Sequence, residues 1–83
     1  MIPQPKRIGR AALLVIANEM IATHEQFFDG MQATDVAQRG DTLIFSGDYF
    51  LDAQGLPGQR SMQVFNVLKF LTTELSPRYR LDL

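Results

Sequence analysis

Few side chains in this sequence belong to types that commonly carry out chemistry, and His24 is the first of them. It is the single histidine of the chain, and histidine is the residue type that gains and loses a proton near neutral pH. With Glu25 to orient it, His24 could act as a general base or as a ligand group in a pocket. It also lies beside Met20, Phe27 and Phe28 on the apolar side of a predicted helix. We favour a structural histidine at the edge of the core, hydrogen-bonded to a backbone carbonyl, because no nucleophile accompanies it.

Two carboxylates, Asp48 and Asp52, lie in the glycine-rich segment FSGDYFLDAQGLPG, residues 45–58. Together with His24 they could line the site of a small-ligand-binding or catalytic protein, which is our alternative hypothesis of function. The spacing does not match a calcium-binding loop, because oxygen ligands do not recur at every second position and no closing glutamate follows. An aspartate in a loop also binds backbone N–H groups two residues on, and Gly55 tolerates unusual backbone conformations. We therefore expect this segment to turn a corner of the fold.

Composition and motifs limit the classes of function. The chain has 83 residues and no cysteine, which excludes disulfides, a thiolate nucleophile and a cysteine-based zinc site. The nucleotide-binding and hydrolase patterns GxGxxG, GxxxxGK[ST], HExxH and GxSxG do not occur. The longest apolar run, residues 11–17, is too short to span a bilayer. We expect a cytoplasmic protein without a metal ion or cofactor, and no membrane as partner.

The charged residues are segregated along the chain. Residues 1–10 have a net charge of +3, residues 11–52 of −6, and residues 53–83 of +2. Nucleic-acid affinity depends mostly on contiguous positive charge. Nucleic acid is therefore disfavoured as a partner unless folding brings the two basic ends together.

Hydrophobic periodicity predicts a single α+β domain over residues 1–83 with the order helix, strand, strand, helix (αββα). The two helices should pack on one face of an antiparallel hairpin, because a lone hairpin is marginally stable. The predicted elements are a frayed segment at 1–7, a helix at about 8–28, strands at about 31–38 and 42–50, a helix at about 59–75, and a short terminal turn through Tyr79 and Leu81.

The hairpin turn admits two registers. A turn centred on Arg39 and Gly40 makes Val36 face Leu43, whereas a type II′ turn at Gly40 and Asp41 makes Val36 face Phe45. Both registers place Val36 on the same face as Leu43 and Phe45. We expect that face to contact the following helix residues: Leu13, Ala17, Met20, Val64, Leu68 and Leu71.

Several apolar residues have no obvious cover in this arrangement. Ile44 and Phe50 are expected on the far side of the hairpin, and Phe70 falls among polar residues of the second helix. With Asp35 and Asp48 at their rim, these residues predict a surface for a basic protein partner. We expect a non-catalytic interaction or regulatory module that is a monomer or weak homodimer.

Four stretches of the sequence resemble a known family. They are ANEMIATHE (17–25), VAQR (36–39), FSGDYFLDAQGLP (45–57) and VFNVLKFL (64–71). Together they resemble the YciN-like family of small bacterial proteins, which is a domain of unknown function, over about residues 8–81. The resemblance implies a compact α+β protein in the cytoplasm of an enterobacterium. It implies no activity, because the family has no assigned catalytic or binding residues to carry over.

Overall fold

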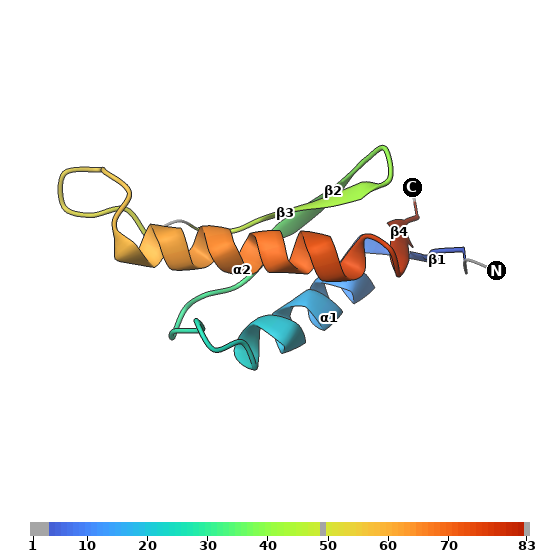
Figure 1. Cartoon of the computed structure of the whole chain (residues 1–83), viewed down its shortest axis with the longest axis horizontal. Helices are drawn as coiled ribbons and strands as arrows, with labels where there is room; N and C mark the ends of the chain where they lie inside the picture. The colour runs from blue at the N-terminus through green and yellow to red at the C-terminus, as the bar shows by residue number, and fades with distance from the viewer. Residues whose placement is uncertain (1–3, 49, 83) are drawn as a thin grey trace.

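The computed structural model describes residues 4–48 and 50–82, which form two helices and two small sheets (Figure 1). The fold is therefore α+β, as predicted. The elements in chain order are β1 (Lys6–Ile8), α1 (Arg10–Ala22), β2 (Asp35–Arg39), β3 (Thr42–Ser46), α2 (Gln59–Leu75) and β4 (Tyr79–Leu81). Residues 1–3 of the expected frayed segment and Tyr49 of the expected second strand lie outside the described residues.

The predicted αββα order omits a strand at each end. Lys6–Ile8 and Tyr79–Leu81 pair in parallel, with Lys6 opposite Tyr79 and Ile8 opposite Leu81. The predictions of a frayed segment through residue 7 and of a terminal turn are therefore wrong for these residues. Each strand is three residues long, too short to show an alternating pattern, and its partner lies at the other end of the chain. Only folding of the whole chain creates this pair.

The hairpin adopts the second of the two predicted registers, with Val36 opposite Phe45. Arg39 pairs with Thr42, so Gly40 and Asp41 form a two-residue turn. Gly40 has a φ of 60°, while the φ of Asp41 is not positive. This combination identifies a type II′ turn, in which only the first central residue has a positive φ.

The first helix ends at Ala22, well before the predicted residue 28. Beyond it, i to i−3 hydrogen bonds close successive turns, from the His24 N–H to the Ile21 carbonyl and from the Phe27 N–H to the His24 carbonyl. Such turns preserve the spacing of the apolar residues, so periodicity alone does not mark the end of the helix. α2 spans Gln59–Leu75, the residues of the predicted second helix.

Both strands of the hairpin are shorter than predicted. β3 ends at Ser46 rather than near residue 50. A side chain at Gly47 would meet the Gln32 carbonyl oxygen, and Phe50 has a left-handed φ of 53°. Close backbone contact and a left-handed residue are both incompatible with a continuing ladder. β2 begins at Asp35 rather than at residue 31.

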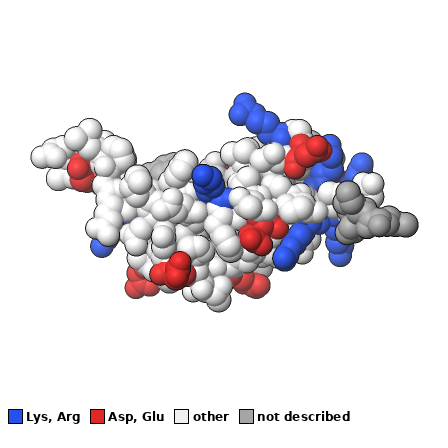
Figure 2. Space-filling view, in the orientation of Figure 1, with Lys and Arg blue, Asp and Glu red and all other residues white. Residues whose placement is uncertain are grey.

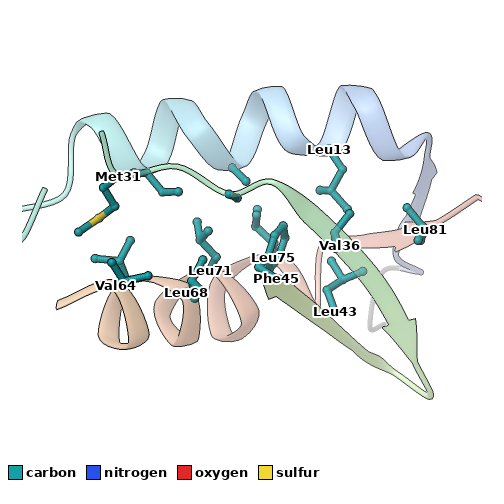
Figure 3. Packing of buried hydrophobic residues seen from close by; sticks show 14 residues of the cluster. Leu13, Met31, Val36, Leu43, Phe45, Val64, Leu68, Leu71, Leu75 and Leu81 are labelled. Atoms are coloured by element: carbon teal, nitrogen blue, oxygen red, sulfur yellow. The ribbon is translucent and has the colours of Figure 1, made fainter. Parts of the chain in front are cut away.

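The hydrophobic core is one cluster with contributions from both helices, the hairpin and β4 (Figure 3). Val36, Leu43 and Phe45 belong to it together with all six predicted helix residues, of which Met20 is only partly buried. The remaining buried members are Ile21, Met31, Ala33, Val67, Leu75 and Leu81. The periodic patterns thus identified most of the core correctly.

Asn18 connects α1 to the segment that precedes β2. Its side-chain oxygen accepts a hydrogen bond from the Ala33 N–H at 2.8 Å, and its amide nitrogen donates to the Ala33 carbonyl at 3.1 Å. Ala33 is buried, so Asn18 supplies the two bonds that a neighbouring strand would otherwise make. Helical phase assigned Asn18 to the polar side of the helix, where it would face solvent. Asparagine is a weak helix former, and its place inside a predicted helix was the available signal of a specific role.

Replacing Asn18 by Ala is expected to lower the free energy of unfolding by about 1 to 3 kcal/mol, because it leaves two buried backbone groups of Ala33 without partners. Urea denaturation followed by circular dichroism measures the loss. Glu19→Ala on the neighbouring exposed position serves as control and should change stability by less than about 0.5 kcal/mol. Equal effects of the two substitutions would show that the contact to Ala33 contributes nothing.

Candidate interaction surfaces

His24 follows the end of α1 and is half-buried. Its ring packs edge-on against Phe70, with ring centroids 4.9 Å apart, and its Nδ1 accepts a hydrogen bond from the Gln26 N–H at 3.0 Å. The partner is thus a backbone N–H and not the expected carbonyl. The same contact accounts for an apolar side chain among the polar residues of α2: Phe70 packs on the imidazole and is 37% exposed.

Phe50 does not lie on the far side of the hairpin. It follows the end of β3, and its ring packs edge-on against Phe28 with the centroids 5.0 Å apart. The guanidinium of Arg60 lies 5.5 Å from the centre of the Phe28 ring. These residues close the corner between the 23–30 turns and the start of α2. Phe50 and Phe70 thus both pack on residues of the 23–30 turns.

The segment after Phe50 turns a corner, as the sequence predicts. One carboxylate oxygen of Asp52 accepts hydrogen bonds from the N–H groups of Gln54 and Leu56, both at 2.9 Å. The Asp52 N–H donates to the Leu56 carbonyl, and Gly55 has a φ of 76°. Asp52 thus organises its own loop. Asp48 lies before Phe50, outside this loop, and is exposed.

The groups of the catalytic alternative are not brought together at a described hollow. Three hollows among the described residues have walls that contain none of His24, Asp48 and Asp52. Among residues 4–48 and 50–82, no three histidine or carboxylate side chains converge in an arrangement that would hold a metal ion.

A groove of about 340 Å³ lies between β3 and the exposed side of α2. We refer to it as the β3–α2 groove. The residues that line it are Ile44, Phe45, Phe65, Leu68, Lys69 and Thr72. Ile44 is 40% exposed and Phe65 is 55% exposed, and Met62, one turn before Phe65, is 61% exposed. The sequence predicted Ile44 as a surface residue, whereas Phe65 and Lys69 were not among the predicted surface residues.

The acidic residues expected at the rim differ in their surroundings. Asp35 lies 3.4 Å from the guanidinium of Arg10, with both side chains more than half exposed. An exposed pair of this kind contributes little to stability, but it offsets the charge of Asp35. The cation that lines the groove is Lys69.

The β1–β4 pair brings the two basic ends of the chain together. Arg7 lies directly opposite Arg80 in the register, and Figure 2 shows Lys and Arg side chains gathered at the end of the molecule where the termini lie. Folding thus brings the two basic ends together, which was the condition for considering nucleic acid as a partner.

These features describe a small α+β protein with an apolar groove and a basic end. The chain matches the model of the family described as "Protein of unknown function (DUF2498)" over residues 4–82. It is 47% identical over 81 residues to "Protein YciN" of Escherichia coli strain K12, which covers 98% of both chains. The YciN proteins of Escherichia coli strains O6:H1 and O157:H7 show the same identity and coverage. The chain therefore belongs to the YciN-like (DUF2498) family, which confirms the resemblance found in its sequence.

Neither helix within the described part of the chain has the length and apolar content needed to cross a membrane.

Proposed function

We propose that this protein is a non-catalytic interaction module of the cytoplasm that binds an extended segment of a partner protein in the β3–α2 groove. The observation that carries the proposal is the exposure of Ile44 and Phe65 on the walls of one groove, with Met62 exposed one helical turn before Phe65. Single exposed apolar residues are common on a monomer and need no explanation. Two large ones on the walls of a shared groove, with a third one turn away, are more typical of a binding surface.

The position of the groove follows from how the hairpin is covered. Val36, Leu43 and Phe45 direct one face of the hairpin into the core, so Ile44 is on the opposite face. With both helices on the core side, the Ile44 face stays open, and the groove forms where its margin meets α2. The proposal therefore depends on one part of the predicted αββα packing, namely that both helices lie on the same face of the hairpin.

The outer edge of β3 is largely covered. The two-residue turn makes Arg39 and Thr42 a hydrogen-bonded pair, and such pairs recur at every second residue. Leu43 and Phe45 therefore direct their backbone groups away from β2. The Leu43 N–H reaches the Ser76 hydroxyl oxygen at 2.9 Å, while Phe45 lines the groove. Leu43 is fully buried and Phe45 is 5% exposed. An extended ligand would therefore bind through its side chains in the groove and not as an added strand.

The charges around the groove favour a segment that carries a carboxylate. Lys69 lines the groove and has no ion pair among the described residues, whereas Asp35 is already engaged by Arg10. We therefore propose an acidic partner in place of the basic one expected from the sequence. The apolar area is small, so the free protein should be a monomer or weak homodimer.

The catalytic alternative receives less support. The Nδ1 atom of His24 is engaged by a backbone N–H, and Asp52 accepts two such bonds from its own loop. Both residues thus have structural roles where the alternative needs them free to meet a substrate. The absence of cysteine fits the reducing interior of a cell, which is part of the proposal.

A phage-displayed library of linear peptides selected against the whole protein tests this function. We expect enriched peptides to alternate apolar residues and to contain Asp or Glu. Phe65→Asp and Ile44→Asp should each weaken binding of the selected peptides at least tenfold, as measured by titration calorimetry. Each substitution would bury a charge in the groove when a peptide binds. Lys69→Glu should reverse the preference toward basic peptides.

Val15→Asp is the matched control, because Val15 is 59% exposed on α1 and does not line the groove. It should leave peptide affinity within about twofold. The proposal fails if no peptide is enriched, or if the three Asp variants behave alike. Sedimentation should show a mainly monomeric protein at micromolar concentration, and a tight dimer lost in Ile44→Asp would show instead that the groove binds a second copy.

A further inference from the structure

The register of the β1–β4 pair places two arginines side by side. Arg7 and Arg80 are directly opposite each other, so both side chains leave the same face of the two-stranded sheet. Like charges at directly opposed positions repel and destabilise a strand pair. Both residues are exposed, and an anion between their guanidinium groups would relieve the repulsion. A guanidinium is suited to phosphate because it donates two parallel hydrogen bonds.

Further cations lie on or beside the same elements. They are Lys6 in β1, Arg10 at the start of α1, Arg39 at the hairpin turn and Arg78 just before β4. Four carboxylates are also near this end: Asp35, Asp41, Glu74 and Asp82. Three of these anions pair with a cation of the cluster. Among the described residues, Lys6, Arg7 and Arg39 have no ion pair and are available to an anionic ligand.

Two hollows adjoin Arg80 and give this end a shape as well as a charge. One, of about 460 Å³, is lined by Pro5, Gln38, Asp41, Ser76, Pro77, Tyr79 and Arg80. The other, of about 220 Å³, is lined by Arg7, Arg80, Leu81 and Asp82. The larger hollow thus combines an aromatic ring and a guanidinium, whereas the Gln38 amide is engaged within the protein: its oxygen accepts a hydrogen bond from the Leu81 N–H and its nitrogen donates to the Gly40 carbonyl. An aromatic ring and a guanidinium plane are groups on which a nucleobase stacks.

We propose that this basic end binds single-stranded nucleic acid, with phosphates at Arg7 and Arg80 and a base against Tyr79. An acidic peptide would satisfy the arginines but would make no use of the tyrosine. A duplex is disfavoured because β1 and β4 have three residues each, whereas groove readers insert a helix or a longer ribbon. The site is separate from the β3–α2 groove and does not depend on the proposed function.

The carboxylates at this end limit the affinity. Asp41 lies 3.7 Å from the Arg80 guanidinium, and Asp82 lines the smaller hollow. A phosphate must displace the first and avoid the second. Binding should therefore resemble non-specific binding in strength and depend strongly on salt. With two to three phosphates engaged, raising the salt from 50 to 200 mM is expected to weaken binding roughly 7- to 18-fold.

Fluorescence anisotropy with a labelled twelve-nucleotide oligothymidine and the whole protein tests the inference. We expect saturable binding at 50 mM salt, and the double variant Arg7→Gln/Arg80→Gln should weaken it at least tenfold. Tyr79→Leu should weaken it several-fold, whereas Tyr79→Phe, which keeps the ring, should retain it. Thermal melts of each variant verify that it is folded at the temperature of the assay.

The control removes the same charge elsewhere, with Arg60→Gln/Lys69→Gln, and should change affinity by less than about twofold. Equal losses in the two double variants would show that only net charge matters and would overturn the site. A twelve-residue oligoglutamate that binds as tightly as the oligonucleotide, and is indifferent to Tyr79→Leu, would identify an acidic protein as the ligand instead. No saturable binding of the oligonucleotide at 50 mM salt would also overturn the inference.

Discussion

Replacing Leu71 by Ala is expected to lower the free energy of unfolding by about 2 to 5 kcal/mol. Leu71 is fully buried, and in Figure 3 it points from α2 into the core together with Leu68. The substitution loses the transfer free energy of the leucine side chain and leaves a cavity. A domain of this size has a total stability of about 4 to 12 kcal/mol, so the loss is a large share of it. Urea denaturation curves with an unchanged slope measure the effect.

Met62→Ala is the control on the same helix, because Met62 is 61% exposed. It should change the stability by less than about 0.5 kcal/mol. A loss below about 1 kcal/mol for Leu71→Ala would mean that α2 does not bury this stripe. Such a result would contradict the core on which both proposals rest for their geometry.

Gly47→Ser is expected to destabilise the protein by about 1 to 3 kcal/mol or more. A Cβ atom at Gly47 would overlap the backbone carbonyl oxygen of Gln32. Backbone cannot rotate out of the way as a side chain can, so the segment before β2 must move. That movement would also loosen the bonds between Asn18 and Ala33. Thermal and urea unfolding should both show the loss.

Gly9→Ser tests whether the effect is specific to the position. Gly9 precedes α1 with a φ of −70°, and a Cβ atom there meets nothing within 4 Å. Serine is also a favourable residue at a helix N-terminus, so stability should stay unchanged or rise by a few tenths of a kcal/mol. If Gly47→Ser were as well tolerated as Gly9→Ser, the result would contradict the close contact between Gly47 and the Gln32 carbonyl.

The parts of the fold that depend on neighbouring residues were predictable. The α2 bounds, the buried face of the hairpin and the corner at Asp52 follow from periodicity, glycine and local hydrogen bonding. These signals act within a few residues, and the structure leaves them intact. The end of α1 was predicted too late, because i to i−3 turns continue the apolar spacing after Ala22.

The candidate sites were less predictable, because each combines residues from distant segments. Ile44 was recognised as an exposed residue, but its neighbour Phe65 comes from α2 and completes the groove only when that helix packs on β3. Phe70 packs on His24, a residue that follows the other helix. No local pattern indicates which exposed apolar residues will share a surface.

By itself, the sequence determined the α+β class, most of the core and the membership of the YciN-like family, because apolar periodicity and motif identity are properties of the order of residues. The tertiary structure alone decided that the chain ends meet as a parallel pair with Arg7 opposite Arg80. Three-residue strands have no pattern of their own, and their pairing is stabilised only when the core between them has formed. The charges that the sequence separates by the length of the chain are thereby concentrated at one end of the molecule.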